Sequence, residues 1–106
     1  LNKILEKNKF SNFKLIKGDI INTLPLFLEK IKSEYFVALD LDVFTATKFA
    51  LEKLYPLVSK NGIILLDDYN QISNTTRAVN KFMKKKKNLK ISKLNFPNRP
   101  SFIIKK

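Results

Sequence analysis

The chain has 106 residues, 44% of them hydrophobic, and a formal net charge of +12, so we expect a single domain over residues 1–106 with a buried core. Because it contains no cysteine, no histidine and only two glycines, it cannot form disulfides, thiolate or imidazole zinc sites, a Ser-His-Asp triad or a glycine-rich phosphate loop. No apolar run approaches the roughly 20 residues of a membrane span, and the first residues are unlike a signal peptide, which favours a cytoplasmic protein.

Hydrophobic periodicity and turn residues predict a regular succession of secondary-structure elements. Their order is helix, strand, helix, strand, helix, strand, helix, strand, strand. The corresponding ranges are 2–9, 13–17, 23–32, 35–42, 46–59, 63–68, 75–87, 89–95 and 101–105. Thr23 as a possible N-cap and Pro25 in the first turn favour a helix start there, whereas Pro56 should kink the third helix or end it early.

Strands alternate with helices over most of the chain, which predicts an α/β fold with a parallel sheet and right-handed crossovers. Residues 35–42 and 63–68 are continuous apolar runs, as in strands that are buried on both faces. No helix is predicted between the last two strands, so we expect them to form an antiparallel hairpin around the loop FPNRP.

Carboxylates follow the predicted strands. All aspartates of the chain lie at such strand ends: Asp19, Asp40, Asp42, Asp67 and Asp68. Ligands of an open parallel sheet bind outside the carboxyl ends of its strands, and neighbouring strand ends would bring Asp40 or Asp42 close to Asp67 and Asp68. Clustered carboxylates repel each other unless a cation lies among them. The pattern therefore favours a site for a hard divalent cation such as magnesium.

Helix capping is the simpler alternative, because a carboxylate after a buried strand often caps the helix that follows. Asp42 or Asp68 could each have only that role. Two neighbouring strand ends that each carry two carboxylates are more than capping needs, so the cation site is the favoured interpretation.

Lysine dominates the positive charge of the chain, with 19 lysines beside Arg77 and Arg99. Base readout and bidentate phosphate contacts favour arginine instead. Lysine, asparagine and isoleucine have codons rich in A and T, so a skewed genome would produce this surface without selection for binding. We expect the run at 84–87 to be a solvated helix end. Binding of RNA or another polyanion through the lysines of residues 81–93 stays open as an alternative function.

Residues 39–69, LDLDVFTATKFALEKLYPLVSKNGIILLDDY, resemble the macrocin O-methyltransferase family, whose pattern is roughly LDxDxYxSTxxALExLYPxLxxGGxIIxDDY. The preceding segment GDIINTLP (18–25) is similar to GxFxDTLP of that family, and the stretch from Arg77 to Phe82 is similar to its RxAVxxF. The resemblance covers residues 14–83 well and the last twenty weakly. The specific feature is the combination of LDxD and DDY with LYP between them.

The resemblance implies a Rossmann-like, S-adenosylmethionine-dependent methyltransferase that methylates a sugar hydroxyl with the help of magnesium. By match to the metal motif of the family, Asp40, Asp67 and Asp68 are the expected ligands of Mg²⁺, an arrangement similar to that of the catechol O-methyltransferases. Asp40 would also receive the proton of the acceptor hydroxyl, with water as the alternative. The sheet of such enzymes ends in an antiparallel hairpin, in agreement with the last two predicted strands.

Several residues take positions of interest in the family pattern. Asp19 stands where the family tends to have an aromatic residue, and we predict a contact with the cofactor, such as its adenine. Thr47 is expected as a helix N-cap first and as a site residue second. Tyr69 either lines the acceptor pocket or is a buried aromatic residue with its hydroxyl bonded. Phe44 replaces a tyrosine, and Asn61 replaces a glycine in a turn that asparagine tolerates.

The resemblance also implies that this chain is the C-terminal portion of the enzyme. The first strand of the family, its glycine-rich cofactor loop and the following strand with a ribose-binding acid have no counterpart in these residues. We therefore expect no methyl transfer by the 106 residues alone. A remnant that keeps the fold without the reaction is a further interpretation, and the oligomeric state stays open, with a homo-oligomer as one option.

Overall fold

The computed structural model describes residues 2–9, 11–32, 34–67, 69–70, 72–93 and 100–106. Helices and strands alternate along most of these residues, as the sequence pattern predicts. In chain order the elements are α1 (Asn2–Lys7), α2 (Ile20–Leu28), β1 (Glu34–Leu39), α3 (Phe44–Leu54), the 3₁₀ helix η1 (Tyr55–Leu57), β2 (Val58–Leu66), α4 (Ser73–Met83), β3 (Ile91–Lys93) and β4 (Ser101–Ile104).

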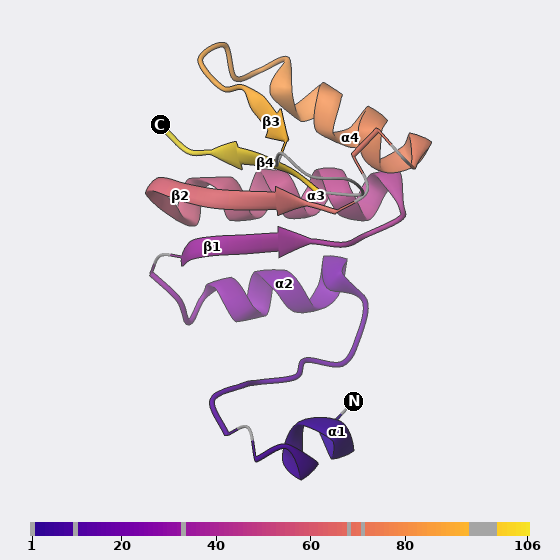
Figure 1. Cartoon of the computed structure of the whole chain (residues 1–106), viewed down its shortest axis with the longest axis vertical. Helices are drawn as coiled ribbons and strands as arrows, with labels where there is room; N and C mark the ends of the chain where they lie inside the picture. Colours follow the sequence, from indigo (N-terminus) through magenta and orange to yellow (C-terminus); the bar gives the residue numbers. More distant parts are fainter. Residues whose placement is uncertain (1, 10, 33, 68, 71, 94–99) are drawn as a thin grey trace.

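Four strands form one open sheet in the order β1-β2-β4-β3 (Figure 1). β1 and β2 run parallel, with Leu39 opposite Leu66. β4 is antiparallel both to β2 and to β3. The predicted α/β fold, with parallel strands followed by an antiparallel hairpin, is therefore confirmed.

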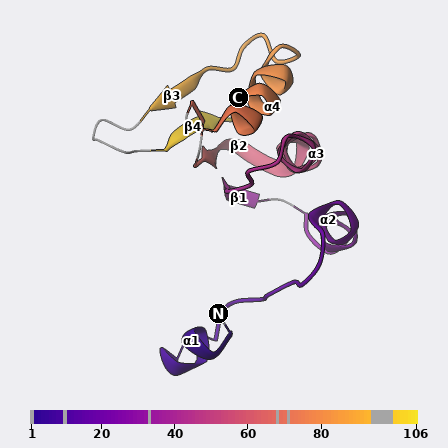
Figure 2. The same ribbon diagram turned by 90° about the vertical axis from the view of Figure 1, so that its right-hand side faces the viewer.

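One face of the sheet carries the core, because α2, α3 and α4 all lie on that side (Figure 2). Side chains alternate between the two faces of a strand, so every second residue of β2 and β4 points to these helices. Among the fully buried side chains are Leu51 of α3, Ile64 and Leu66 of β2, and Ile103 of β4. Burial of each such side chain contributes about 1.5–3 kcal/mol to folding.

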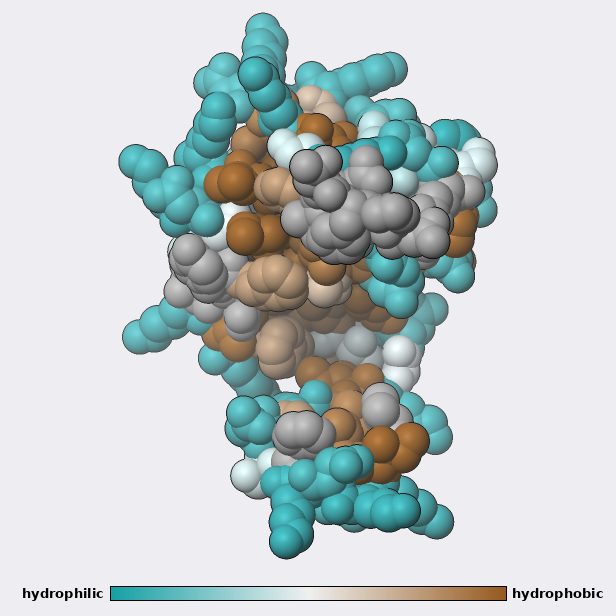
Figure 3. Space-filling view, viewed as in Figure 1, coloured by the Kyte–Doolittle hydropathy of each residue, from teal (hydrophilic) through white to brown (hydrophobic). Residues whose placement is uncertain are grey.

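The opposite face of the sheet is also apolar, yet no helix of the described residues packs on it (Figures 2 and 3). Strand register puts two rows of side chains across this face: Phe36, Ile63 and Ile104, and next to them Ala38, Leu65 and Phe102. Phe36 is 54% exposed and Ile104 is 43% exposed. We refer to these six residues as the bare sheet face.

The predicted strand at 13–17 is wrong. These residues are extended but pair with no strand of the described chain, and they lie apart from the sheet (Figure 1). Leu15 and Ile16 are both 46% exposed, and they line an open hollow of about 340 Å³ together with Leu26 and Phe27 of α2. A strand needs a neighbouring strand for its backbone hydrogen bonds. The outer edges of the sheet are at β1 and β3, and residues 13–17 do not lie beside either of them (Figure 1).

The second helix starts earlier than predicted. α2 begins at Ile20, and its N-cap is Asp19, whose carboxylate accepts a hydrogen bond from the Ile21 N–H. The predicted N-cap, Thr23, lies inside the first turn and donates its hydroxyl to the Asp19 carbonyl instead. Pro25 consequently lies within the helix, which ends at Leu28 and not at residue 32.

The two parallel strands end before the carboxylates that follow them. The sequence predicts the first of these strands over 35–42, but β1 ends at Leu39. It predicts the second over 63–68, but β2 runs from Val58 to Leu66. Asp40, Asp42 and Asp67 therefore lie in the loops at the carboxyl ends of the strands, where side chains are free to face a ligand.

The third and fourth helices also differ from the predicted ranges. α3 spans Phe44–Leu54, and Pro56 ends it in the 3₁₀ helix η1, as the proline predicts. α4 spans Ser73–Met83, so the lysine run at 84–87 follows the helix. Asn61 has a left-handed φ of 68°, which confirms that asparagine supports this conformation in place of glycine.

The hairpin at the end of the chain is shorter than predicted. β3 covers Ile91–Lys93 and β4 covers Ser101–Ile104. Most of the predicted FPNRP loop lies outside the described residues. Among the described residues, no helix is both long and apolar enough to cross a membrane.

Candidate functional site

The carboxyl ends of β1 and β2 bring Asp40 and Asp67 together. The parallel ladder places Leu39 opposite Leu66, and the Asp67 N–H extends it by donating a hydrogen bond of 3.1 Å to the Leu39 carbonyl. Each aspartate is therefore the first residue beyond its strand. This pairing, expected from the sequence, is confirmed for Asp40 and Asp67.

The two carboxyl groups are close enough to affect each other's ionisation. A hydrogen bond with Asp40 raises the pKa of Asp67 above its ordinary value, and slight burial and the negative charges of Asp40 and Asp42 raise it further. A second carboxylate close by disfavours the ionised form. The electrostatic preference of this end of the sheet is therefore for a positive charge between the acids.

Helix capping does not account for Asp42. The N-cap of α3 is Val43, and its side chain makes no capping hydrogen bond. Asp42 is exposed, as are Asp40 and Asp67, and its charge acts on Asp67. The acids at this end of the sheet thus share one electrostatic environment.

The chemistry of this donor set fits a hard divalent cation. Carboxylate oxygens are the ligands that magnesium prefers, and the side chains of Asp40 and Asp67 are near each other and open to solvent. Among the described residues, no group of three acidic side chains is placed to hold a metal ion. Asp68, the third predicted ligand, lies outside the described residues, so its role stays a prediction.

The loop that follows β1 is held by two buried threonines. The hydroxyl of Thr47, in α3, lies 3.0 Å from the Leu41 carbonyl and 2.8 Å from the Val43 carbonyl. The hydroxyl of Thr75, in α4, donates to the same Leu41 carbonyl over 2.8 Å. Thr47 is therefore not the N-cap that the sequence predicts. It lies one turn inside α3, and its hydroxyl bonds to carbonyl groups of the preceding loop.

The loop that follows β2 is bonded to α4 at two of its described residues. The Asn70 N–H donates a 2.8 Å hydrogen bond to the hydroxyl of Thr76. The Tyr69 hydroxyl donates to Oδ1 of Asn80 over 2.7 Å. Tyr69 is half-buried with its hydroxyl bonded, which is one of the two roles expected for it.

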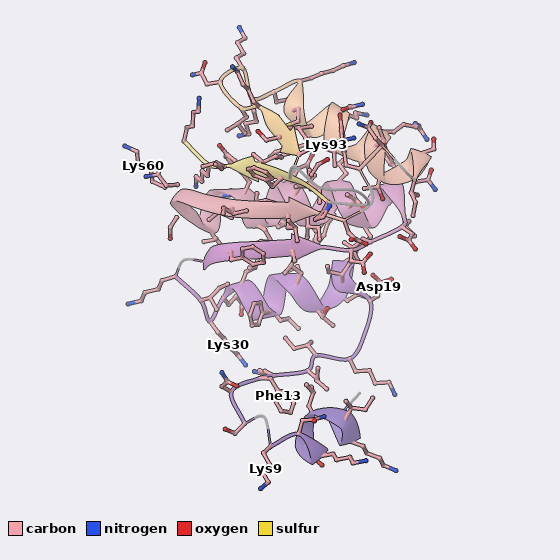
Figure 4. The ribbon with its side chains drawn as sticks, viewed as in Figure 1. Lys9, Phe13, Asp19, Lys30, Lys60 and Lys93 are labelled. Carbon is pink, nitrogen blue, oxygen red and sulfur yellow. The ribbon has the colours of Figure 1, made fainter. Side chains whose placement is uncertain are left out.

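Asp19 lies at the same end of the sheet as the carboxylate pair. In Figure 4 it is at the start of α2, on the side toward which the arrows of β1 and β2 point. One carboxylate oxygen caps α2, and the side chain is exposed. Capping explains an acid at this position, and the predicted cofactor contact of Asp19 stays a prediction.

Two further residues near the site were not identified from the sequence. The sequence predicts Thr75 and Thr76 only as the start of a helix. The cluster of serine, asparagine and threonine at residues 73–76 is a helix-start signal, but which loops these hydroxyls would reach depends on tertiary contacts. Arg77, next along the helix, lies over the ring of Phe44, with its guanidinium carbon 4.9 Å from the ring centroid.

The opposite end of the sheet is positively charged. Lys60 marks this end in Figure 4, on the side away from Asp19. Beyond the end of α4, two open hollows of about 490 and 390 Å³ are lined mainly by lysine residues. Their lining residues are Tyr55, Lys85, Lys86, Lys87, Asn88, Leu89, Lys90 and Lys106.

Comparison with known proteins relates this arrangement to a group of methyltransferases. The model of the macrocin O-methyltransferase family, TylF, matches residues 8–95. None of the curated proteins searched matches the chain. Among solved structures, the O-methyltransferase NovP superposes with a TM-score of 0.84 over 97% of this chain, at 20% sequence identity.

Two structures of CalS11 are also similar. One is described as an apo TDP-rhamnose 3'-O-methyltransferase of calicheamicin biosynthesis, and the other as calicheamicin methyltransferase. They superpose with TM-scores of 0.75 and 0.76 over 85% of this chain, at 22% identity. This chain spans 42% of NovP and 40% and 36% of the two CalS11 chains. At these identities the likeness establishes a shared methyltransferase fold.

Proposed function

Since this chain belongs to the macrocin O-methyltransferase family, we propose that it is part of an S-adenosylmethionine-dependent, magnesium-assisted O-methyltransferase. The acceptor is a hydroxyl of a sugar or of a glycosylated small molecule. The description of CalS11 as a TDP-rhamnose 3'-O-methyltransferase supports this class of acceptor. The chain spans less than half of each of these relatives, so the activity is proposed for the whole protein.

The observation that carries the proposal is the contact between the Asp40 and Asp67 carboxyl groups at the ends of two parallel strands. Repulsion between them has no structural benefit, and neither caps a helix among the described elements. A cation-binding role gives a reason for this placement, because the attraction of each carboxylate to a cation between them outweighs their mutual repulsion.

Asp40 and Asp67 would hold the magnesium ion, with Asp68 as the third predicted ligand. A bound divalent cation lowers the pKa of an acceptor hydroxyl, which is otherwise far above neutral pH, and orients the oxygen for attack. Asp40 would take the proton of that hydroxyl, and water is the alternative acceptor. The contact of S-adenosylmethionine with Asp19 belongs to the same proposal, and its carboxylate is exposed at this end of the sheet.

Calorimetric titration of Mn²⁺ and Mg²⁺ into the chain tests the proposal. We expect saturable binding to the wild type and at least tenfold weaker binding to Asp67→Asn, because the variant removes one charged ligand. Glu52→Gln is the matched control. Glu52 is an exposed acid on α3 whose carboxylate pairs with Lys48 at 2.6 Å. Equal binding by wild type and Asp67→Asn, or no binding by either, would contradict the metal site.

A second candidate function, binding of RNA, is favoured by the lysine-lined hollows beyond α4. These lie at the end of the sheet away from the carboxylates, so the two functions have separate residues. For RNA binding, affinity for a single-stranded oligonucleotide should fall steeply with salt and should not respond to Asp67→Asn. Affinity that does not change between 50 and 200 mM salt, about the range where phosphate contacts weaken, would exclude it.

A further inference from the structure

We infer that Thr75 and Thr76, two adjacent residues in the first turn of α4, are positioning residues that hold Asp40 and Asp67 at the separation the cation requires. Each threonine ties one of the two carboxylate-bearing loops to the same rigid helix. The inference rests on the proposed function, because it concerns the same pair of carboxylates.

The first tie connects α4 to the loop after β1. Thr75 is 4% exposed, and its hydroxyl donates to the Leu41 carbonyl over 2.8 Å. Leu41 lies between Asp40 and Asp42, so this bond fixes the backbone that carries both acids. The hydroxyl of Thr47, from α3, also reaches the Leu41 carbonyl. A carbonyl oxygen has two lone pairs and can accept both bonds.

The second tie connects α4 to the loop after β2. The Thr76 hydroxyl accepts the Asn70 N–H over 2.8 Å, and Asn70 has a left-handed φ of 68°. The Tyr69 hydroxyl, bonded to Asn80 at 2.7 Å, anchors the same loop one turn further along α4. Asp67 begins this loop, three residues before the Asn70 N–H that Thr76 holds.

These hydroxyl groups are not needed to form α4. The N-cap of the helix is Ile72, which makes no side-chain cap, and the first backbone bond runs from the Thr76 N–H to the Ile72 carbonyl. Valine has nearly the shape of threonine and would fill the same space. The hydroxyl groups of both threonines are therefore used for contacts between helix and loops.

Fixed loops matter here because the carboxylates push each other apart when no cation lies between them. If either loop could yield, the pair would separate, and a cation would have to bring the ligands back together. Ligands already held in place make that rearrangement unnecessary, so affinity is higher. Residues that orient metal ligands typically change metal affinity by 10–100-fold when they are replaced.

The test is Mn²⁺ affinity, measured by calorimetry on the full chain with Thr75→Val and Thr76→Val. We expect roughly tenfold weaker binding for each variant. Thr75→Ser should restore most of the affinity, because serine keeps the hydroxyl. Thr45→Val is the matched control, since Thr45 is an exposed residue of the first turn of α3 and should leave the affinity unchanged.

A second readout is amide hydrogen exchange without metal. Thr76→Val should speed exchange at the Asn70 N–H while exchange at β2 amides stays slow, which separates loss of the tie from loss of the fold. If Thr75→Val unfolds the protein, Thr76→Val still tests the inference, because Thr76 is only half-buried.

The outcomes separate the inference from the proposed function. Absence of Mn²⁺ binding by the wild type would overturn both. Wild-type binding that Asp67→Asn abolishes, together with Thr75→Val and Thr76→Val binding within twofold of the wild type, would overturn the positioning role alone. Weaker binding that Thr75→Ser does not restore would likewise count against it, since packing and not the hydroxyl would then be responsible.

Discussion

Asp40 and Asp67 place two negative charges at one end of the sheet, in a chain whose net charge is +12. Without a bound cation this arrangement costs free energy when both groups are ionised. The pKa of Asp67 is raised chiefly by its hydrogen bond with Asp40, and further by slight burial and by the negative charges of Asp40 and Asp42. A carboxyl group whose pKa is raised on folding lowers the free energy of unfolding at neutral pH, compared with acidic pH. Binding of a cation and stability of the free protein therefore make opposite demands on these residues.

The first prediction at this scale concerns Asp67→Asn in the absence of divalent cations. We expect the variant to melt about 1–4 °C above the wild type at pH 7, because it removes a repulsion that solvent partly screens. The gain should disappear as the pH falls below the usual range of carboxyl pKa values, where Asp67 is protonated in both the folded and the unfolded state. Calorimetric melting of both proteins at several pH values measures this difference in melting temperature.

Added Mg²⁺ should reverse the order of the two proteins. A ligand that binds only the folded state raises the melting temperature, and the wild type alone should show that rise. Asp67→Asn melting below the wild type at pH 7 without metal would contradict the repulsion.

A second prediction concerns the contact of Arg77 with Phe44. The guanidinium lies 4.9 Å from the ring centroid and connects α4 to the first residue of α3. Arg77→Gln should lower the free energy of unfolding by about 0.5–1 kcal/mol, the usual contribution of an exposed cation–π contact. Urea unfolding measures this, with Lys81→Gln as the control for loss of a positive charge on the same helix. An equal effect of both substitutions would exclude a specific contact.

At the scale of elements, α2 is notable for the proline inside it. Asp19 caps the helix at Ile20, so Pro25 comes at its sixth residue, where the missing N–H leaves one backbone carbonyl without its helical partner. Gly18 makes the cap possible: its φ is 135°, and a Cβ there would lie 2.8 Å from Cγ2 of Thr23. The N-terminus of α2 is therefore well capped, whereas Pro25 weakens the hydrogen bonding in its interior.

We therefore predict that Pro25→Ala stabilises the protein by about 1–2 kcal/mol. The gain from the restored hydrogen bond and from removal of the ring exceeds the loss of the rigidity that proline gives to the unfolded chain. Chemical unfolding followed by circular dichroism measures the change, with Asn22→Ala as the control at another exposed position of α2. A destabilised Pro25→Ala would mean that the ring makes packing contacts that outweigh its cost.

At the scale of the whole molecule, the helices of the described residues cover one side of the sheet. Three helices pack on one face, whereas the bare sheet face presents apolar side chains of β1, β2 and β4 (Figures 2 and 3). Exposed apolar patches of this kind mark surfaces that another part of a protein, or another molecule, covers. Within the described part of the chain, no strand pairs with the outer edge of β1, which lies beside the patch.

We predict that the 106-residue chain binds a hydrophobic dye and self-associates as its concentration rises. Phe36→Lys together with Ile104→Lys should reduce both effects, because these are the most exposed large side chains of the bare sheet face. Fluorescence titration and sedimentation measure them. Leu26→Lys, at a 63% exposed residue of α2 on the other side of the sheet, is the control, and an equal reduction by this variant would point to non-specific charge repulsion.

Except for the strand at 13–17, the sequence alone determined the order of the helices and strands, the end of α3 at Pro56 and the antiparallel hairpin. It also placed Asp40 and Asp67 at neighbouring strand ends. These features follow from local signals: periodicity, proline, and apolar runs that end in carboxylates. Element boundaries were less accurate, because a strand such as β1 ends where its backbone partners end and not where its apolar residues do.

Tertiary structure decided the rest. Residues 13–17 have the composition of a strand, but no neighbouring strand among the described residues offers hydrogen bonds. The hydroxyl of Thr75 reaches a carbonyl 34 residues away, a contact for which no local pattern exists. Which face of the sheet the helices cover, and which loops α4 holds, depend on contacts between distant segments. Such contacts form only after the local elements have packed together, so sequence patterns within one element cannot contain them.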